Sequence, residues 1–363
     1  MTLVKTYAAL PLEISHAKDV YVWDTKGRRY LDLYAGHAVC STGHCHPEVV
    51  KAIQEQAAKL IFYSNVAGLP LREEAAEKLV VHAPGYQVLF ANSGAEANED
   101  ALKLARKFTK RDEVIAMMGG FHGRTAGAIS VTGIEKYRVG PQVPGVRFVP
   151  FGSVPEISST TAAVILEPIQ SMAGIRTAPP EYFQKLRAAC DRAGALLIYD
   201  EVQTGIGRTG TMFFSGRHGV QADLVTLAKG IASGVPLSAV LVKAVIAQTV
   251  QHGDFGHTFG AGPLAMAALK ATISVVETLL SNVNDTSAYC VEKMKPFGEV
   301  RGLGLLLGLK FPSNAVPVRD ALLARGVIVG TADEPGVLRL LPPLTLQRSH
   351  VDEFIGALRE ALR

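Results

Sequence analysis

Two charged side chains follow two short apolar segments in the middle of the chain. Ala195–Tyr199 is followed by Asp200, and Leu224–Ala228 is followed by Lys229. Both segments have the length and the apolar content of buried strands. Because ligands of an open α/β sheet bind at the carboxyl ends of its strands, we expect Asp200 and Lys229 to face one apolar crevice.

An acid and an amine in one crevice suit a cofactor with a basic ring nitrogen and an aldehyde, which describes pyridoxal phosphate. A lysine forms a Schiff base only through its neutral amine, and burial lowers its pKa towards that form. A carboxylate beside the ring nitrogen favours the protonated ring, which is a better electron sink. Taken singly, Asp200 and Lys229 have a simpler explanation as a turn cap and a solvated strand end. Together with their flanking residues they favour the cofactor.

The flanking sequences are DEVQTGIGRTG at 200–210 and TLAKG at 226–230. They resemble the core of the class III, fold type I pyridoxal phosphate aminotransferases, closest to the acetylornithine and ornithine branch. The resemblance extends from about Val20 to the C-terminus, with the motifs in the family's order. It implies that Gln203 binds the ring hydroxyl and that Val202 packs on the ring.

A turn of small residues precedes a predicted helix in the sequence NSGAEANE. Such a turn presents free N–H groups and the positive end of the helix dipole to a phosphate. An ordinary capped helix, with Ser93 and Glu96 as the capping pair, explains the same residues without a ligand. The resemblance implies that the backbone at Gly94 and Ala95, next to Ser93, holds the cofactor phosphate. It also implies that Thr258 reaches this phosphate from the neighbouring subunit of a homodimer.

The sequence GGFHGRT follows a strand predicted at 114–118. An aromatic side chain at a strand's carboxyl end can stack on a flat ring. Outside a family context, a core phenylalanine and a surface arginine are the better explanation of these residues. The resemblance implies that Phe121 covers the cofactor ring, with His122 beside it. It also implies that Arg124 grips a substrate carboxylate with its planar fork of donors.

Glu167 belongs to an EPIQ sequence that follows a strand, and the resemblance places it near the cofactor ring. The chain then departs from the family, which continues Gly-Glu-Gly-Gly or Gly-Glu-Ala-Gly, whereas residues 171–174 are SMAG. In ornithine-type relatives the glutamate of that stretch pairs with a second arginine, which corresponds to Arg339, and masks it until glutamate arrives. Because Met172 cannot form this ion pair, we hypothesise that Arg339 is unmasked or is masked by another residue.

Three further patterns invite other functions. His257 stands where the family has a small hydroxyl residue; it is a candidate substrate contact, although Lys229 already supplies the acid–base group and a local hydrogen-bonding role is the simpler one. The glycines of 205–210 spell G-x-G-x-x-G, but they do not begin at the strand end, which argues against a dinucleotide-dependent dehydrogenase. GHCHP at 43–47 offers adjacent potential ligands without a distant partner set, so we expect no metal.

Composition limits the class of protein. The chain has 363 residues, of which 48% are hydrophobic and 19% charged, with a net charge of +4. This length suits about two domains, and the small charge without basic runs argues against nucleic-acid binding. We expect no membrane partner, because no apolar run approaches membrane-spanning length and the start of the chain lacks a signal-peptide core. Four cysteines at irregular spacing make no disulfide framework and suit a cytoplasmic enzyme.

Alternating predicted strands and helices indicate an α/β fold. We expect an N-terminal hairpin in 14–34, a helix from Pro47 and a long helix through about Leu280. A strand over 301–311, a short helix and a final amphipathic helix should follow. The resemblance implies a large domain with a mostly parallel sheet flanked by helices, plus a small α+β domain made from both ends of the chain. The boundaries expected are 1–50 and 282–363 for the small domain and 51–281 for the large one.

The function that these observations indicate is transfer of the terminal amino group of N-acetylornithine, or a similar acylated diamino acid, to 2-oxoglutarate, as in arginine biosynthesis. Lys229 and Asp200 would be catalytic, and Arg124 and Arg339 would bind carboxylates. Ornithine, 4-aminobutyrate and carrier-linked lysine are alternative donors. An aminomutase of the same fold and a non-catalytic cofactor-binding protein are alternatives of another class.

Overall fold

A computed structural model describes residues 4, 6 and 8–363. Its largest element is a seven-stranded sheet in the order β4-β10-β9-β8-β7-β5-β6. β10 is antiparallel to both of its neighbours, and every other neighbouring pair is parallel. The strands are β4 (Tyr86–Ala91), β5 (Glu113–Met117), β6 (Val146–Val149), β7 (Thr161–Leu166), β8 (Leu196–Asp200), β9 (Leu224–Leu227) and β10 (Ser238–Lys243). The mostly parallel sheet expected from the sequence is confirmed, with β6 as a strand that the sequence reading missed.

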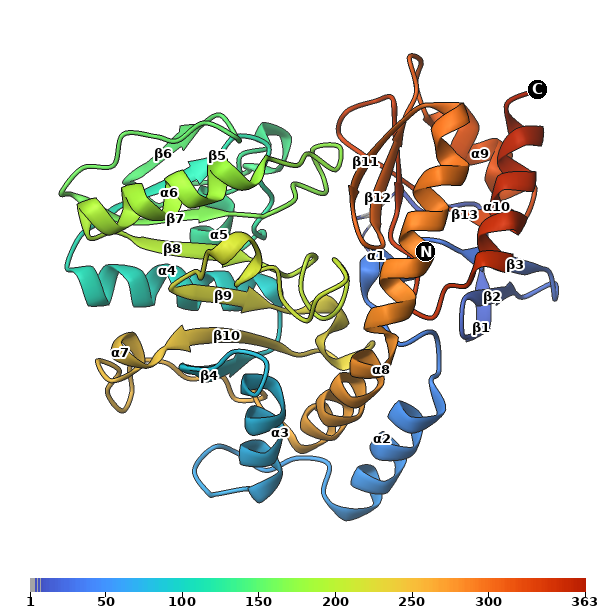
Figure 1. Ribbon diagram of the computed structural model, residues 1–363. Coiled ribbons are helices and arrows are strands. Elements are labelled where there is room, and N and C mark those ends of the chain that lie inside the picture. The colour runs from blue at the N-terminus through green and yellow to red at the C-terminus, as the bar shows by residue number, and fades with distance from the viewer. Residues whose placement is uncertain (1–3, 5, 7) are drawn as a thin grey trace.

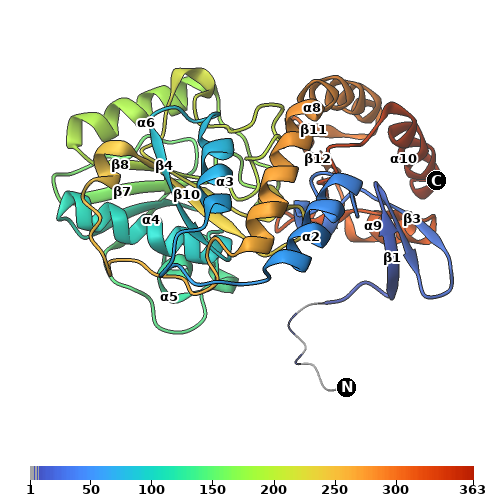
Figure 2. The ribbon, with the colours of Figure 1, turned by 90° about the horizontal axis from the view of Figure 1, so that it is seen from below.

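Helices cover both faces of this sheet, which is why its central strands are continuous apolar runs. Every residue of β7, β8 and β9 is buried. Figure 2 shows α6 (Pro180–Ala193) and α4 (Gly94–Thr109) on opposite sides of the sheet. Leu197 belongs to the apolar cluster that contains α6 residues, and Ile198 to the one that contains α4 residues, as the alternation of a strand requires.

Two four-stranded sheets lie beside the large one (Figure 1). The first has the order β1-β2-β3-β13 and the second β11-β12-β15-β14. β13 comes from the C-terminal segment and pairs in parallel with β3, so both ends of the chain build one sheet. The strands are β1 (Ile14–Lys18), β2 (Tyr21–Asp24), β3 (Arg29–Asp32), β11 (Glu299–Leu303), β12 (Leu306–Lys310), β13 (Val327–Ile328), β14 (Gly330–Thr331) and β15 (Val337–Leu340).

The remaining helices connect and cover these sheets. The helix expected from Pro47 and the final amphipathic helix are both present. The segment named α1 is a left-handed turn, because its backbone φ angles are positive from Ala35 to Ala38. Besides this turn, α1 (Ala35–Ala38), the helices are α2 (Pro47–Lys59), α3 (Pro70–Val80), α5 (Ala126–Ser130), α7 (Ala244–Ala247), α8 (Pro263–Met294), α9 (Val316–Ala324) and α10 (Arg348–Ala361).

The helix end expected at about Leu280 is wrong, because α8 continues to Met294. No proline interrupts the sequence between Pro263 and Pro296, and the distal half of the helix packs against α10. Figure 1 shows α8 running from below the large sheet, next to α2 and α3, into the region of the small sheets. Residue 282, the expected start of the C-terminal domain, therefore lies inside a continuous helix, and the domain boundaries stay predictions.

The expectation that no apolar run approaches membrane-spanning length is also wrong. Pro263–Phe297 is long enough and apolar enough to qualify, with a mean hydropathy of 1.5. Half of its apolar window is buried inside the protein. Lys270 pairs with Glu74, and Glu277 with Lys78, which ties this helix to α3. These contacts identify α8 as a core helix.

The strand expected over 301–311 is a hairpin of β11 and β12. Gly302 and Gly304 have φ angles of +109° and +58°, a conformation in which glycine is favoured. A side chain at Gly304 would also collide with the backbone of Thr209. The chain therefore reverses where the apolar pattern alone reads as one continuous strand.

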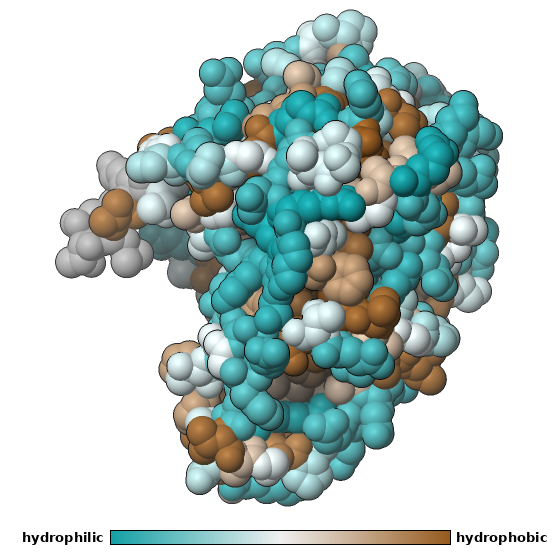
Figure 3. All heavy atoms as spheres, turned by 90° about the vertical axis from the view of Figure 1, so that its left-hand side faces the viewer, coloured by the Kyte–Doolittle hydropathy of each residue, from teal (hydrophilic) through white to brown (hydrophobic). Residues whose placement is uncertain are grey.

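The side of the large-sheet region that faces away from the small sheets carries mostly hydrophilic residues (Figure 3). Hydrophobic residues are present on it in small separate groups. Small apolar groups scattered among polar residues are ordinary on a protein surface.

The Asp32–His44 pair stabilises the left-handed turn. Asp32 accepts hydrogen bonds from the backbone N–H groups of Tyr34 and Ala35, both at 2.9 Å, and its other oxygen lies 2.8 Å from His44 Nε2. Burial by itself lowers the pKa of His44, but its bonds to Asp32 and Cys40 raise it to about 10 from an ordinary 6.5.

We expect this pair to make stability depend on pH. Folded His44 keeps its proton over a pH range in which the unfolded chain loses it, so its contribution is complete below about pH 6.5 and is lost as the pH rises towards 10. Urea unfolding at pH 6, 8 and 10 measures the free energy of unfolding. This free energy should decrease less with rising pH in His44→Asn than in wild type. The exposed His252→Asn is the control and should keep the wild-type decrease. Equal pH dependence in wild type and His44→Asn would contradict the prediction.

Candidate active site

The structure brings Asp200 and Lys229 to the same edge of the large sheet. Asp200 ends β8, and Lys229 follows β9 after one residue. The two strands are neighbours, with Asp200 opposite Thr226. Burial lowers the pKa of the Lys229 amine, although the charges of Asp200 and Glu167 oppose this. The site therefore favours the neutral amine that a nucleophile or general base needs.

Buried polar groups fix the Asp200 carboxylate, which is only 3% exposed. One oxygen, Oδ2, lies 2.7 Å from His122 Nδ1 and accepts a hydrogen bond from Asn98 Nδ2 at 2.8 Å. The other oxygen, Oδ1, accepts the backbone N–H of Val202 at 3.0 Å. Asn98 is itself held by the Thr226 hydroxyl at 2.8 Å. The carboxylate is thus held in one orientation by Asn98 on α4, by His122 after β5 and by the backbone of Val202.

Glu167 adds a second buried acid to this edge. Burial raises its pKa to about 7, the Asp200 charge adds to the rise, and His122 opposes it. Its Oε1 accepts the backbone N–H of Phe121 at 2.8 Å. A carboxyl group with a pKa near neutrality can hold or release a proton at physiological pH.

The turn before α4 has the geometry of a capped helix start. The Ser93 hydroxyl accepts the N–H of Glu96 at 3.3 Å, and Glu96 reaches back to the N–H of Asn92 at 2.9 Å. At the first helical residue, Gly94, a Cβ would stand only 3.0 Å from a methyl group of Val202. The N-terminus of α4 and the Asp200 loop are therefore in close contact, with free N–H groups available to an anion.

Two buried polar atoms at this edge have no hydrogen-bond partner among the described residues. They are Oε1 of Gln203 and Nε2 of His122. Leaving such atoms unpaired is costly, so a ligand or water is expected to satisfy them. An acceptor at Gln203 suits a ring hydroxyl, and Asp200 suits a protonated ring nitrogen. The residues present therefore fit pyridoxal phosphate.

The two predicted substrate arginines have different surroundings. Arg124 is exposed, and its guanidinium lies over the rings of Phe121 at 5.6 Å and Tyr137 at 5.3 Å. Arg339 is only 3% exposed and projects from β15. Its guanidinium donates to the hydroxyls of Ser171 and Tyr34.

His257 and Thr258 lie on the loop before α8. His257 Nε2 is 2.7 Å from Asp100 Oδ2, so its imidazole is engaged with α4. Thr258 is exposed, and the Phe259 ring beside it packs against the Phe62 ring at an angle of 53°, with centroids 5.3 Å apart. Within one chain, Thr258 stands on an exposed surface.

The residues that support the site through hydrogen bonds and ring contacts carry little or no signal in the sequence. Asn98 follows the predicted phosphate turn by one helical turn, a spacing that gives a weak signal. Tyr34 and Tyr137 lie in segments without a motif, and only their contacts reveal them. In the sequence, Ser171 is visible only as part of the departure from the family pattern at 171–174.

Gly207 and Gly210 pack against α8. A side chain at Gly207 would meet Val276, and one at Gly210 would meet Asn284. Both residues have positive φ angles, +79° and +86°. Close packing and backbone conformation therefore explain these two glycines.

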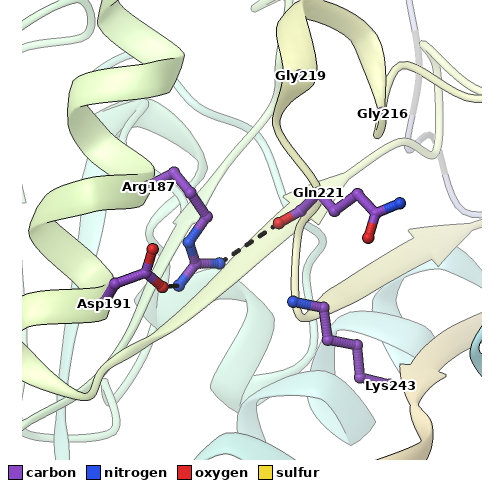
Figure 4. A pocket seen from close by; sticks show the side chains of 6 residues that line it. All are labelled: Arg187, Asp191, Gly216, Gly219, Gln221 and Lys243. Carbon is purple, nitrogen blue, oxygen red and sulfur yellow. Dashed lines mark hydrogen bonds and ion pairs between the residues drawn. The ribbon is translucent and has the colours of Figure 1, made fainter.

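The site does not coincide with the cavity drawn in Figure 4, which has a volume of about 360 Å³. Gln221 precedes β9 and Lys243 ends the antiparallel β10, so this cavity lies at the opposite end of β9 from Lys229. Asp223 neutralises its cations, since Arg187 and Lys243 each lie 2.7 Å from it. None of the predicted site residues lines this cavity.

Comparison with known proteins agrees with the fold and the site. The family model for class-III aminotransferases matches residues 3–362. The acetylornithine aminotransferase of Methanocaldococcus jannaschii is 39% identical, over 98% of this chain and 95% of the relative. Ornithine aminotransferase from Toxoplasma gondii has a similar structure, with a TM-score of 0.94, 29% identity and coverage of 99% and 92%. An amine transaminase from an uncultivated Pseudomonas species, solved in its PLP-bound form, has a TM-score of 0.91 and 29% identity, over 99% of this chain and 98% of the neighbour.

A fold type I α/β core with a buried lysine–aspartate pair at the strand ends defines a pyridoxal phosphate enzyme. The chain belongs to the class-III aminotransferases. It is an enzyme, and its cofactor is pyridoxal phosphate.

Proposed function

We propose that this enzyme moves the terminal amino group of N-acetylornithine to 2-oxoglutarate in two half-reactions. The observation that carries the proposal is the buried Asp200–Lys229 pair, with one arginine at the surface and one buried. A donor with one carboxylate and an acceptor with two require such a set. Relatives that are 37–41% identical over nearly their whole length are named acetylornithine aminotransferase, which supports this donor.

The residues proposed to hold the cofactor lie at one edge of the sheet. Its phosphate would bind the N-terminus of α4, where Ser93, Gly94 and Ala95 present backbone N–H groups. Asp200, oriented by His122, would bind the ring nitrogen and Gln203 the ring hydroxyl. The ring would lie between Val202 and Phe121, near Glu167. The bound cofactor would supply an electron sink and an acceptor for the amino group.

Lys229 would hold the cofactor covalently and then act as the base that moves a proton at the reacting carbon. Its lowered pKa provides the neutral amine for both tasks. Glu167 would exchange a proton close to this amine. Arg124 would bind the carboxylate that donor and acceptor share, and Arg339 the second carboxylate of the acceptor. His257 would support the substrate site indirectly, through Asp100 on α4.

A homodimer is proposed as the working unit, in which Thr258 completes the phosphate site of the partner subunit. The support is a group of exposed apolar side chains on two adjoining loops, at Ile61, Phe62, Val66 and Phe259. Asn65 Nδ2 ties the loops together by donating to the carbonyls of His257 and Gly260. Such a patch is characteristic of an interface. A cytoplasmic location is proposed because all four cysteines are free.

The visible absorption spectrum of the purified holoenzyme tests the function. N-acetylornithine, added without an oxo acid, should remove the band of the bound cofactor aldehyde, and 2-oxoglutarate should restore it. Ornithine and 4-aminobutyrate serve as comparison donors. A band that is insensitive to N-acetylornithine but lost with glutamate would keep the aminotransferase and discard this donor. A protein that binds no pyridoxal phosphate would overturn the whole proposal.

A further inference from the structure

Arg339 is a buried cation whose hydrogen-bond partners among the described residues are all neutral. Its Nε donates to the carbonyl of Thr331 at 2.7 Å, Nη1 to the Ser171 hydroxyl at 3.1 Å, and Nη2 to the Tyr34 hydroxyl at 2.6 Å. Among the described residues no carboxylate forms an ion pair with it. A buried charge without a counter-charge is costly, and an anionic ligand would relieve that cost.

The two hydroxyls that accept from Arg339 keep their own protons. A serine or tyrosine hydroxyl is one donor as well as an acceptor. For Tyr34 and Ser171 the acceptor side faces the guanidinium, and no internal acceptor for either proton is found among the described residues. Burial raises the pKa of the Tyr34 phenol, although the charge of Arg339 opposes this. The phenol is therefore protonated at neutral pH.

The backbone around Tyr34 holds its ring on Arg339. Asp32 binds the N–H groups of Tyr34 and Ala35 at the start of the left-handed turn. The guanidinium lies 5.5 Å from the centre of the Tyr34 ring. On the other side, β14 has Gly330 directly opposite Arg339, and any side chain at Gly330 would collide with the Tyr34 ring. Tyr34 is therefore fixed by three separate segments.

Ser171 is fixed as firmly. It is fully buried, and its carbonyl accepts the N–H groups of Gly174 and Ile175 in a tight turn. The turn is closed by a bridge between Gln170 and Arg176. Ser171, which precedes Met172, thus places its hydroxyl on Arg339 without adding a negative charge.

We propose that Tyr34 and Ser171 determine the specificity of this enzyme for a dicarboxylate acceptor. Together with Arg339 they form a carboxylate receptor of one guanidinium and two O–H donors, and no carboxylate of the described part of the chain pairs with it. The hydroxyls position the arginine and leave its full charge available to the second carboxylate of the acceptor. A donor with a single carboxylate does not use this receptor. The inference rests on the proposed function for the identity of the substrate.

Glutarate and pentanoate test the receptor without catalysis. Both are unreactive five-carbon acids, but only glutarate has a second carboxylate. Their dissociation constants would be measured by calorimetry on the holoenzyme of wild type, Tyr34→Phe and Ser171→Ala. Losing one hydrogen bond to a charged group should weaken glutarate binding by about tenfold or more in each variant and leave pentanoate within about twofold. Ser171→Thr keeps the hydroxyl and should bind glutarate more tightly than Ser171→Ala.

Tyr30→Phe is the matched control. It removes a buried phenol from β3, where the Tyr30 hydroxyl donates to Asp24 at 3.0 Å and, among the described residues, makes no hydrogen bond to Arg339, Tyr34 or Ser171. It should leave the binding of both acids unchanged.

Steady-state kinetics test the same inference through the KM of each substrate. Tyr34→Phe should raise the KM for 2-oxoglutarate and leave that for N-acetylornithine unchanged. Unchanged glutarate affinity in both Tyr34→Phe and Ser171→Ala would overturn the inference, as would an equal loss for glutarate and pentanoate. Failure of the proposed function would look different, because wild type would prefer glutarate to pentanoate yet transfer no amino group from N-acetylornithine.

Discussion

Lys229→Ala is expected to reduce transamination by about 10⁴-fold, the upper end of the effect of a general acid–base group. Among the described residues, Lys229 supplies the amine at the ends of β8 and β9, so the variant would lose both the proposed covalent hold on the cofactor and the proposed proton carrier. Steady-state rates with N-acetylornithine and 2-oxoglutarate measure the loss. Dialysis should also remove pyridoxal phosphate from the variant faster than from wild type.

Two further variants distinguish the need for a neutral amine at position 229 from the need for a positive charge there. Lys229→Arg keeps a cation, but a guanidinium does not provide a neutral amine at working pH, so it should be as inactive as Lys229→Ala. Lys107→Ala removes a lysine that pairs with Asp254 on the surface, and it should keep wild-type activity. If Lys229→Arg retained more than about a tenth of the activity, the role assigned to the neutral amine would be wrong.

Asp200→Asn is expected to lower kcat by about 10² to 10³-fold, the scale of removing one preorganised electrostatic group. Asparagine has nearly the same size, but it replaces an anion by a neutral amide, so the ring nitrogen loses its counter-charge. The amide must also face the Asn98 Nδ2 donor and His122, both of which lie on Asp200 Oδ2. We therefore expect a shifted cofactor absorption band as well as a slower rate. Single-turnover bleaching by the donor measures the chemical step directly.

Thr226→Val distinguishes loss of charge from loss of orientation. It removes the hydroxyl that holds Asn98 at 2.8 Å, one step away from the carboxylate. Its effect should be less than about tenfold, because Asp200 keeps its charge and its other partners. An Asp200→Asn variant as active as Thr226→Val would show that the carboxylate acts only through position.

Local sequence patterns predicted two features of the site: the charged residues that follow strands and the turn that precedes a helix. Asp200 and Lys229 each follow an apolar run, and parallel strands bring their carboxyl ends to one edge, so their proximity follows from sequence alone. The capped turn at Ser93 was predictable for the same reason, since its partners Asn92 and Glu96 are close in sequence.

Elements whose limits depend on distant contacts were predicted less well. α8 was expected to end near Leu280, but the packing of its second half against α10 continues it to Met294. Residues 301–311 have the apolar pattern of one strand, yet Gly302 and Gly304 allow a reversal that the neighbouring backbone requires. In both cases tertiary contacts override the local pattern.

The sequence by itself determined the class of enzyme and predicted Asp200 and Lys229 as its catalytic pair, because both residues lie in short motifs at the ends of regular elements. It also showed that Met172 cannot mask Arg339. Only the tertiary structure decided what holds Arg339 instead. Tyr34 and Ser171 are 305 and 168 residues away from it in sequence. Hydrogen bonds over such separations depend on how β15, the left-handed turn and the 171–175 turn pack together, and no local periodicity encodes that packing.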